Sequence, residues 1–231
     1  FSFFDKKNTY NLAGRAAISR LSFKDGATPN STGYSHTITF AKTSGLFTFN
    51  VAQELTDTKF NSNDLGYFTN NNFINHRIYA GYRFTEPKGW YNRLMFNLNS
   101  DISYLYSPIG NIESKYQNAR IQLNINAQTK KLIWFGLMLN YRPSENDFYE
   151  PRQTGHVYSR GQSVTLGGWI ESNSAKKYSF TAELFDRMFL NFYELNGIDL
   201  FLGQTYRFNS RFSINYRLGF LPRPRGMGYT T

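Results

Sequence analysis

The segment from 143 to 161, PSENDFYEPRQTGHVYSRG, gathers acidic, basic and imidazole side chains that could do chemistry. Asp147 and Glu150 lie close in sequence, and two neighbouring carboxylates can act as the acid and the base of glycoside hydrolysis. Arg152 and His156 follow in the same segment. Carboxylates beside an arginine in a loop more often form an internal ion pair, and residue types alone do not establish a catalytic site. We therefore interpret this group as an ion pair between arginine and carboxylate that holds the loop together internally.

A second polar segment, TDTKFNSNDLGYFTNN from 56 to 71, offers oxygen ligands. Asn61, Asn63 and Asp64 have side chains of the kind that bind calcium. Their spacing does not match an EF-hand loop, and no terminal glutamate follows. Asn, Asp and Gly are also the residues that build turns, and we prefer this interpretation.

Aromatic rings in the same two segments could stack on sugars or peptides. Together with the polar residues they give the candidate ligand-binding residues of the loops, which are Asn63, Asp64, Tyr67, Asp147, Tyr149, Glu150 and Arg152.

The rest of the sequence shows no familiar catalytic or metal-binding pattern. The three histidines, His36, His76 and His156, share no ligand spacing, and the chain has no cysteine. His36 and His76 fall among apolar strand residues, which predicts structural roles. No Walker loop, GxSxG elbow or dinucleotide fingerprint is present. The sequence therefore predicts no catalytic residue, no metal site and no cofactor.

The elements that carry these loops are predicted by a two-residue period. In ARIQLNINA, from 119 to 127, apolar residues alternate with Arg120, Gln122, Asn124 and Asn126. Such alternation is typical of a β-strand with one apolar and one polar face. No run approaches the roughly 20 apolar residues of a membrane-spanning helix.

Alternation continues through the chain and predicts about eleven strands. We place them at 9–21, 33–42, 46–56, 72–84, 90–106, 117–128, 131–142, 162–172, 177–187, 198–208 and 211–220. The connections are alternately tight, as in KTSG (42–45) and EPKG (86–89), and long and polar, as in the two segments above. Outer-membrane barrels combine short periplasmic turns with long extracellular loops in this way, whereas sandwiches mix their loop lengths.

Composition supports a transmembrane barrel. Aromatic residues make up 18% of the chain and charged residues also 18%, below the roughly 25% of soluble domains, while the mean hydropathy is only −0.52. The net charge of +10 suits lipopolysaccharide or an anion-selective interior. Lysine and arginine form no run, which argues against nucleic acid as a partner.

The two faces of the strands are expected to meet different surroundings. In a soluble sandwich the polar face would be the solvated one, whereas in a barrel it lines the lumen and the apolar face meets lipid. The predicted lipid-facing residues are Phe40, Phe47, Phe49, Phe96, Leu98, Ile121, Leu123, Ile125, Phe135, Leu137, Leu139 and Ile214. The predicted lumen-facing charged residues are Arg15, Arg77, Arg83, Arg93, Asp101, Arg120, Glu171, Glu183, Arg187, Arg207 and Arg217, in which arginines outnumber acids.

The chain is expected to be one part of a larger barrel. Eleven is an odd number of strands, whereas single-chain bacterial barrels have an even number. We therefore assign residues 1–231 to part of one barrel domain, an all-β, antiparallel up-and-down transmembrane β-barrel whose other strands lie outside this sequence.

Two loop motifs and one repeated tripeptide resemble a known family. They are NDLGYFTNNNF (Asn63–Phe73), DFYEPRQTG (Asp147–Gly155) and YRF at Tyr82–Phe84 and Tyr206–Phe208. They resemble the C-terminal barrel of a family of large Bacteroidota outer-membrane proteins of unknown function. Those proteins carry an N-terminal carbohydrate-binding family 9-like domain. The resemblance implies carbohydrate binding, and glycoside hydrolysis only through that separate domain.

The expected function is that of a non-enzymatic barrel in the bacterial outer membrane, a pore or an anchor linked to carbohydrate or polymer binding and uptake. Its expected partners are outer-membrane lipid and lipopolysaccharide, carbohydrate, and other outer-membrane proteins in a complex. Three alternatives stay open: a structural barrel subunit of a secretion or assembly complex, a barrel like that of TonB-dependent transporters, and an outer-membrane hydrolase.

Overall fold

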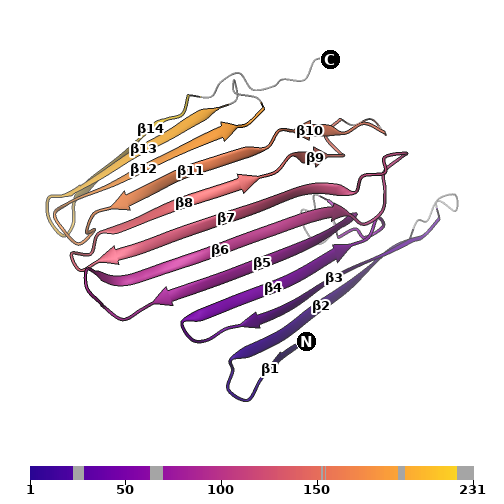
Figure 1. Ribbon diagram of the computed structural model, residues 1–231, viewed down its shortest axis with the longest axis horizontal. Coiled ribbons are helices and arrows are strands. Elements are labelled where there is room, and N and C mark those ends of the chain that lie inside the picture. The colour runs from indigo at the N-terminus through magenta and orange to yellow at the C-terminus, as the bar shows by residue number, and fades with distance from the viewer. Residues whose placement is uncertain (23–28, 63–69, 152, 154, 192–195, 223–231) are drawn as a thin grey trace. The chain divides into compact units, whose positions relative to one another are not determined.

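The computed structural model describes residues 1–22, 29–62, 70–151, 153, 155–191 and 196–222, and in these residues all regular structure is β. Within these ranges, twelve strands form one antiparallel sheet in the order β1 to β8 followed by β11 to β14, while β9 and β10 form a separate two-stranded ribbon (Figure 1). The strands are β1 (Ser2–Phe4), β2 (Tyr10–Leu21), β3 (Ser31–Lys42), β4 (Phe47–Thr56), β5 (Phe73–Phe84), β6 (Tyr91–Leu105), β7 (Tyr116–Thr129), β8 (Trp134–Arg142), β9 (Glu145–Asp147), β10 (Tyr158–Arg160), β11 (Ser163–Glu171), β12 (Tyr178–Phe189), β13 (Gly197–Arg207) and β14 (Ser213–Phe220). In the part of the chain described, no helix is long and apolar enough to cross a membrane.

The eleven predicted strands are confirmed, as β2 to β8 and β11 to β14, with small shifts at their ends. The largest shift is at β8, which begins at Trp134 rather than at 131. Leu132 has a φ of 60° and donates its N–H to the Thr129 carbonyl, so it belongs to the turn. The alternation of tight and long connections is also confirmed.

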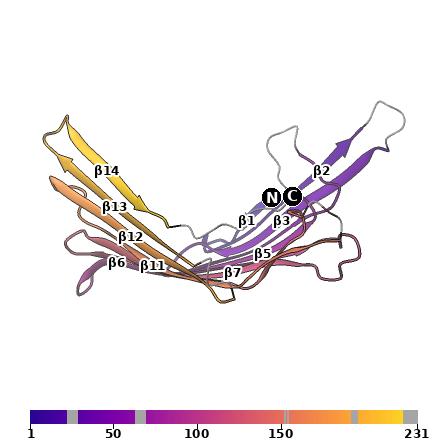
Figure 2. The same ribbon diagram turned by 90° about the horizontal axis from the view of Figure 1, so that it is seen from above.

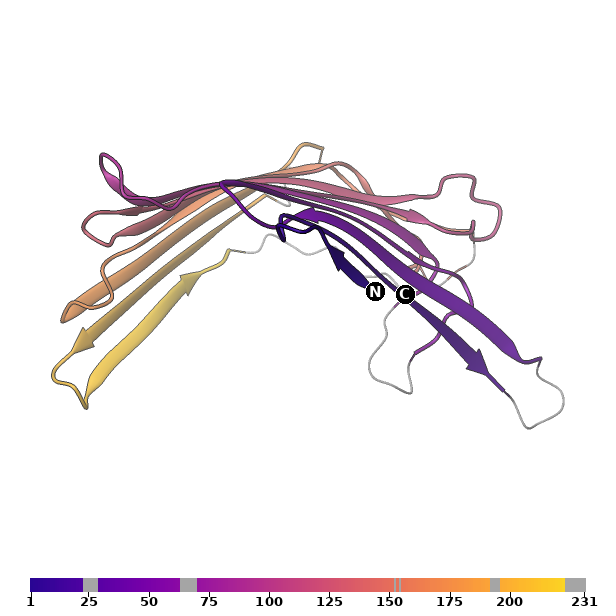
Figure 3. The same cartoon turned by 90° about the horizontal axis from the view of Figure 1, so that it is seen from below.

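Three short strands were not predicted. β1 pairs with β2 through a turn held by Asp5, and the N-terminal amine of Phe1 donates a hydrogen bond to the Gly14 carbonyl. The indigo strands beside the N mark in Figure 3 are this pair. β9 and β10 lie inside the segment 143–161, which the sequence predicted as a loop. Strands of three residues are too short to show a two-residue period.

Contacts divide the chain into two units. The first comprises Phe1–Ala80, Asn99–Arg120 and Ser144–Arg160, and the second comprises Gly81–Leu98, Ile121–Pro143 and Gly161–Thr231. In the second unit, β11 to β14 run side by side in two views (Figures 1 and 2).

The second unit has one apolar and one polar face, because directly paired residues of neighbouring strands share a face. One row of successive partners on the apolar face is Ile125, Leu137, Gly168, Leu184, Leu200 and Phe220. The neighbouring row on the opposite face is Asn126, Gly136, Trp169, Glu183, Phe201 and Gly219. Leu137 is 60% exposed and Leu184 is 53% exposed, so the apolar face is open to its surroundings.

The first unit repeats this division. Leu12, Phe40 and Val51 are successive partners on its apolar face, and all three are exposed. Arg15, Thr37 and Glu54 are successive partners on its polar face. Few apolar side chains in the described ranges are buried; the buried ones are Ala41, Leu55, Phe60, Leu105, Ala127 and Phe148.

The connection after β4 is held against β3 by one buried carboxylate. Asp57 accepts hydrogen bonds from the N–H groups of Phe60, at 2.7 Å, and Tyr34, at 3.1 Å. Gly33 allows this close approach, because a Cβ atom there would overlap the backbone of Phe60. The loop is therefore anchored at its first residues.

Candidate functional site

A row of alternating charges crosses the polar face of the first unit. We call Arg15, Glu54, Arg77, Asp101 and Arg120 the charge row. Arg77 Nη2 lies 2.6 Å from Glu54 Oε2, and Arg120 Nη2 lies 2.7 Å from Asp101 Oδ1. Arg120 Nε donates a second hydrogen bond to the same oxygen, at 2.8 Å. Arg15, at the end of the row, has no acidic partner in the ranges that the structure describes.

Cavities adjoin the charge row. One of about 340 Å³ is lined by Arg15, Thr37, Glu54 and Arg77, among others. A second of about 330 Å³ shares Thr37 and Arg77 and adds amide and hydroxyl groups together with Asp101 and Arg120. The arrangement can therefore hold water or a polar solute between charges of both signs, with an excess of guanidinium groups.

The polar face of the second unit carries a further ion pair. Arg217 Nη2 donates to Glu183 Oε1 at 2.8 Å, and its guanidinium carbon lies 4.5 Å from the centre of the Phe201 ring. The register places the remaining predicted charged residues of β11 to β13 on this face, namely Glu171, Arg187 and Arg207. Arg83 lies on β5 between Tyr82 and Phe84, and Arg93 lies on β6 between Asn92 and Leu94.

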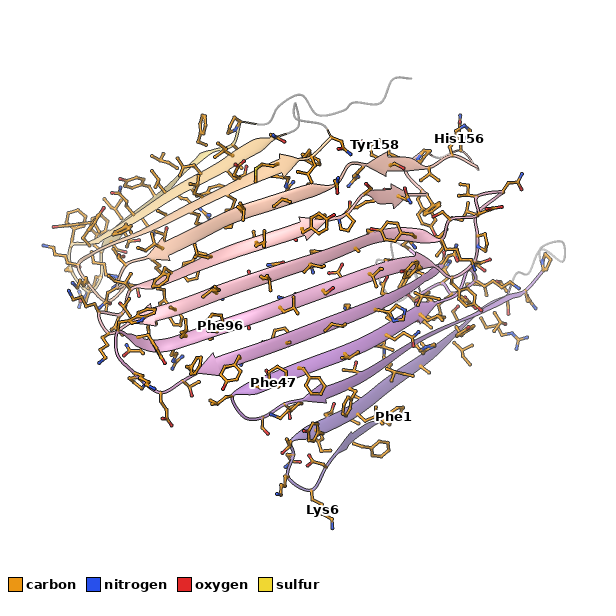
Figure 4. The ribbon with its side chains drawn as sticks, in the orientation of Figure 1. Phe1, Lys6, Phe47, Phe96, His156 and Tyr158 are labelled. Carbon is orange, nitrogen blue, oxygen red and sulfur yellow. The ribbon has the colours of Figure 1, made fainter. Side chains whose placement is uncertain are left out.

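The predicted apolar residues share the opposite face within each unit. The ring of Phe49 contacts those of Phe40 and Phe47, at 5.6 Å and 6.1 Å between centroids. Phe47 and Phe96 are labelled in Figure 4, and Phe96 and Leu98 alternate with polar residues on β6. In the second unit the register groups Ile121, Leu123, Ile125, Phe135, Leu137, Leu139 and Ile214 on the apolar face.

A third cavity lies among the long connections of the first unit. We call it the loop pocket; its volume is about 250 Å³, and its walls are Asn70, Gln117, Asn118, Glu145, Asn146, Asp147, Tyr149 and Arg160. The ribbon of β9 and β10 positions one side of it, because Arg160 is paired with Glu145, and Tyr158, labelled in Figure 4, is paired with Asp147. Asn146 ties the ribbon to β7 by donating to the Tyr116 carbonyl at 3.1 Å.

Gln117 is the unusual member of the loop pocket. Its side chain is only 9% exposed, and its Nε2 atom has no acceptor in the part of the chain described. A buried donor without an acceptor costs about 1–3 kcal/mol. The cost is removed if a bound molecule or water supplies an oxygen.

Tyr149 forms another wall of the loop pocket. Its hydroxyl donates to the Asn71 carbonyl at 3.3 Å, and burial raises the pKa of this phenol. The group therefore stays protonated and acts as a donor at neutral pH. The preceding residue, Phe148, is buried.

Only some of the loop residues predicted as ligands line the loop pocket. Asp147 and Tyr149 both line the loop pocket, whereas Glu150 is not among its walls. Asp147 Oδ1 accepts the N–H groups of Tyr149 and Glu150, each at 3.0 Å, so backbone donors hold this carboxylate. Asn63, Asp64, Tyr67 and Arg152 lie outside the described residues. The predicted ion pair between Arg152 and a carboxylate of the same loop therefore stays a prediction.

The histidines and acids of the described ranges form no cluster of three or more that could hold a metal ion. His36 lies on the apolar face of β3, paired with Leu55 and stacked on Tyr34. His156 lies in the turn between β9 and β10 (Figure 4).

The whole chain, residues 1–231, matches the model of a protein family described as a domain of unknown function, DUF5916. The chain belongs to the DUF5916 family. Comparisons with curated proteins and with solved structures found no match.

Sequence reasoning missed several residues that this DUF5916 chain brings to its two sites. Glu54 pairs with Arg77, and its position on the polar side of β4 could have been found from alternation with Leu55. Gln117 and Asn118 reach the loop pocket from β7, and Arg160 reaches it from β10. No sequence signal links the two strands, because only the folded chain brings both into the wall of one cavity.

Proposed function

We propose that this DUF5916 chain is part of a transmembrane β-barrel in a bacterial outer membrane, with lipid against its apolar face and water against its polar face. The observation that carries the proposal is the unbroken division of faces in the second unit. Apolar partners follow one another from β7 to β14, and Ile125, Leu137, Leu184 and Phe220 in this row are exposed. A soluble protein would have to bury such a face against another part of the molecule or a partner, because exposure of a large apolar surface to water is unfavourable.

Strand length supports the same proposal. The eleven long strands contain 8 to 15 residues, and a tilted strand needs about 9–11 residues to cross the hydrocarbon core of a bilayer.

Aromatic rings and lysines near the tight turns also support it. Tyr206 and Phe208 lie 4.7 Å apart at the end of β13, and Lys177 lies 5.2 Å from the Tyr206 ring. In the first unit, Lys42 lies 5.8 Å from the Phe47 ring. Aromatic girdles and snorkelling lysines are typical of the boundary between hydrocarbon and headgroups.

Under this proposal the protein is a non-enzymatic pore or anchor for carbohydrate or polymer handling at the cell surface. The charge row then faces a hydrated interior in which arginine is in excess, which favours anionic solutes. The family resemblance adds a Bacteroidota origin and a separate N-terminal carbohydrate-binding domain to the proposal.

The test combines fractionation with conductance of the full-length protein. We expect the protein in the outer-membrane fraction, and an anion-biased conductance after reconstitution into planar bilayers. Recovery in the soluble fraction would refute the barrel. If the protein inserts into the bilayer but conducts no ions, the open pore is refuted and the proposal that the barrel is an anchor remains.

A further inference from the structure

We propose that the loop pocket binds one residue of a neutral saccharide. This inference deepens the proposed function, on which it rests, by naming a site and a ligand class. Residues from two long connections and from β7 form the pocket, so it lies where a surface glycan would meet the proposed barrel.

The strongest support is the buried donor of Gln117. Its side chain forms part of the pocket wall, yet Nε2 has no acceptor in the described ranges. Buried side-chain donors in folded proteins normally have a partner. A sugar hydroxyl can accept from this amide and donate to a neighbouring oxygen at the same time.

Two further amides offer the complementary groups. Among the residues that the structure describes, no hydrogen bond reaches the side chain of Asn70 or Asn118, both of which line the pocket. Each of these amides carries two donors and one acceptor. Asn146 is different, because it donates to Tyr116 and accepts from Ser159, and it serves as scaffold.

Tyr149 supplies apolar surface beside these polar groups. Its side chain is 39% exposed and lines the pocket. Sites for small ligands combine such aromatic surface with a few fixed polar groups. The hydroxyl of Tyr149 is already engaged with Asn71, which fixes the ring.

Charge and size define the ligand class. Glu145 and Asp147 face one arginine, Arg160, in the pocket wall, so an anionic group is disfavoured. The volume of about 250 Å³ is below the roughly 300–1,000 Å³ of pockets for drug-sized ligands. A single uncharged sugar residue fits both limits.

The test uses full-length protein in detergent and a panel of neutral trisaccharides, namely maltotriose, cellotriose, mannotriose and triacetylchitotriose, with trigalacturonate as the anionic comparison. Binding is measured by saturation-transfer NMR and calorimetry. The variant is Gln117→Met, which keeps the side-chain volume and removes the donor. The matched control is Gln128→Met on the same strand, outside the pocket.

We expect at least one neutral trisaccharide to bind, and Gln117→Met to weaken it about ten-fold, as the loss of one hydrogen bond predicts. Gln128→Met should bind as the wild type does. Gln117→Met should also melt no lower than the wild type, because replacing an unsatisfied donor by an apolar group of equal size is not destabilising. A fall in its melting temperature would mean that Gln117 is structurally engaged and would overturn the proposal.

Absence of binding by any neutral trisaccharide, equal binding by Gln117→Met, or a preference for trigalacturonate would each overturn the pocket proposal. Membrane fractionation of the same preparation separates this failure from that of the proposed function. A protein that inserts but binds no glycan refutes the pocket alone, and a soluble protein that binds glycan refutes the barrel alone.

Discussion

Arg77 on β5 and Glu54 on β4 form an ion pair of 2.6 Å across two strands of the polar face. The arginine side chain is 55% exposed and the glutamate 24% exposed. A pair this open to solvent contributes little to stability, about 0–1 kcal/mol. Its larger effect is on local charge, because Glu54 neutralises one of the arginines that line the adjoining cavity.

Removal of that acid should raise the preference for anions without unfolding the protein. In Glu54→Gln, Arg77 loses its partner and the polar face gains one unit of positive charge. We expect the reversal potential in a salt gradient to shift toward the anion potential, with a loss of stability of at most about 1 kcal/mol. Glu86→Gln, in the tight turn after β5, is the control and should leave selectivity unchanged. An unaltered reversal potential in Glu54→Gln would argue that ions do not pass the charge row.

Arginine substitutions on the two faces should differ in cost. Leu137→Arg places a charge on the apolar face and should reduce stability in the membrane by about 2–4 kcal/mol if the site is near the bilayer midplane. Asn124→Arg, on the polar face of the neighbouring strand, should be mild. The measurement is the free energy of unfolding in lipid vesicles. Equal losses in the two variants would contradict the assignment of the apolar face to lipid.

Gly136 makes room for Trp169 on the polar face of the second unit. A Cβ atom at position 136 would overlap the indole Nε1 and would lie 2.7 Å from Asn126 Oδ1. Gly136→Ala should therefore displace the indole and cost about 1–3 kcal/mol, as overpacking does. Tryptophan emission and urea unfolding check this. The cost should shrink in a Trp169→Leu background, and an equal cost there would show that the indole is not the group displaced.

The turn between β1 and β2 should loosen only in acid. The Asp5 carboxylate accepts N–H groups of Tyr10, at 2.7 Å, and Thr9, at 2.5 Å, and these hydrogen bonds, that of Tyr10 foremost, lower the pKa of Asp5 below 3.8. Because the folded pKa is lowered, the contribution of Asp5 is complete above about pH 3.8 and is lost as pH falls through the lowered value. Hydrogen exchange of the Tyr10 amide should rise only in that acidic range. In Asp5→Asn the acidic transition should vanish, and its persistence would assign it to another group.

Strands with long alternating stretches were predictable from the sequence, because every second residue of a strand lies on the same face of the sheet. In β7, nine consecutive residues follow the pattern, and the strand extends to Tyr116–Thr129. β1 carries three residues, and its pairing depends on the Asp5 turn rather than on its own pattern. The loop pocket was not predictable, because Gln117 lies on β7 and Arg160 on β10, and only the folded chain brings both into the wall of one cavity.

The separation of β9 and β10 from the main sheet has a consequence for exchange kinetics. Two strands of three residues have little stability of their own in water. Their backbone amides should therefore open and close independently of the main sheet, with a free energy well below that of global unfolding. Since Glu145, Asn146 and Arg160 belong to this ribbon, occupancy of the cavity beside it would slow that local opening, and the protection of a few amides would report on the site.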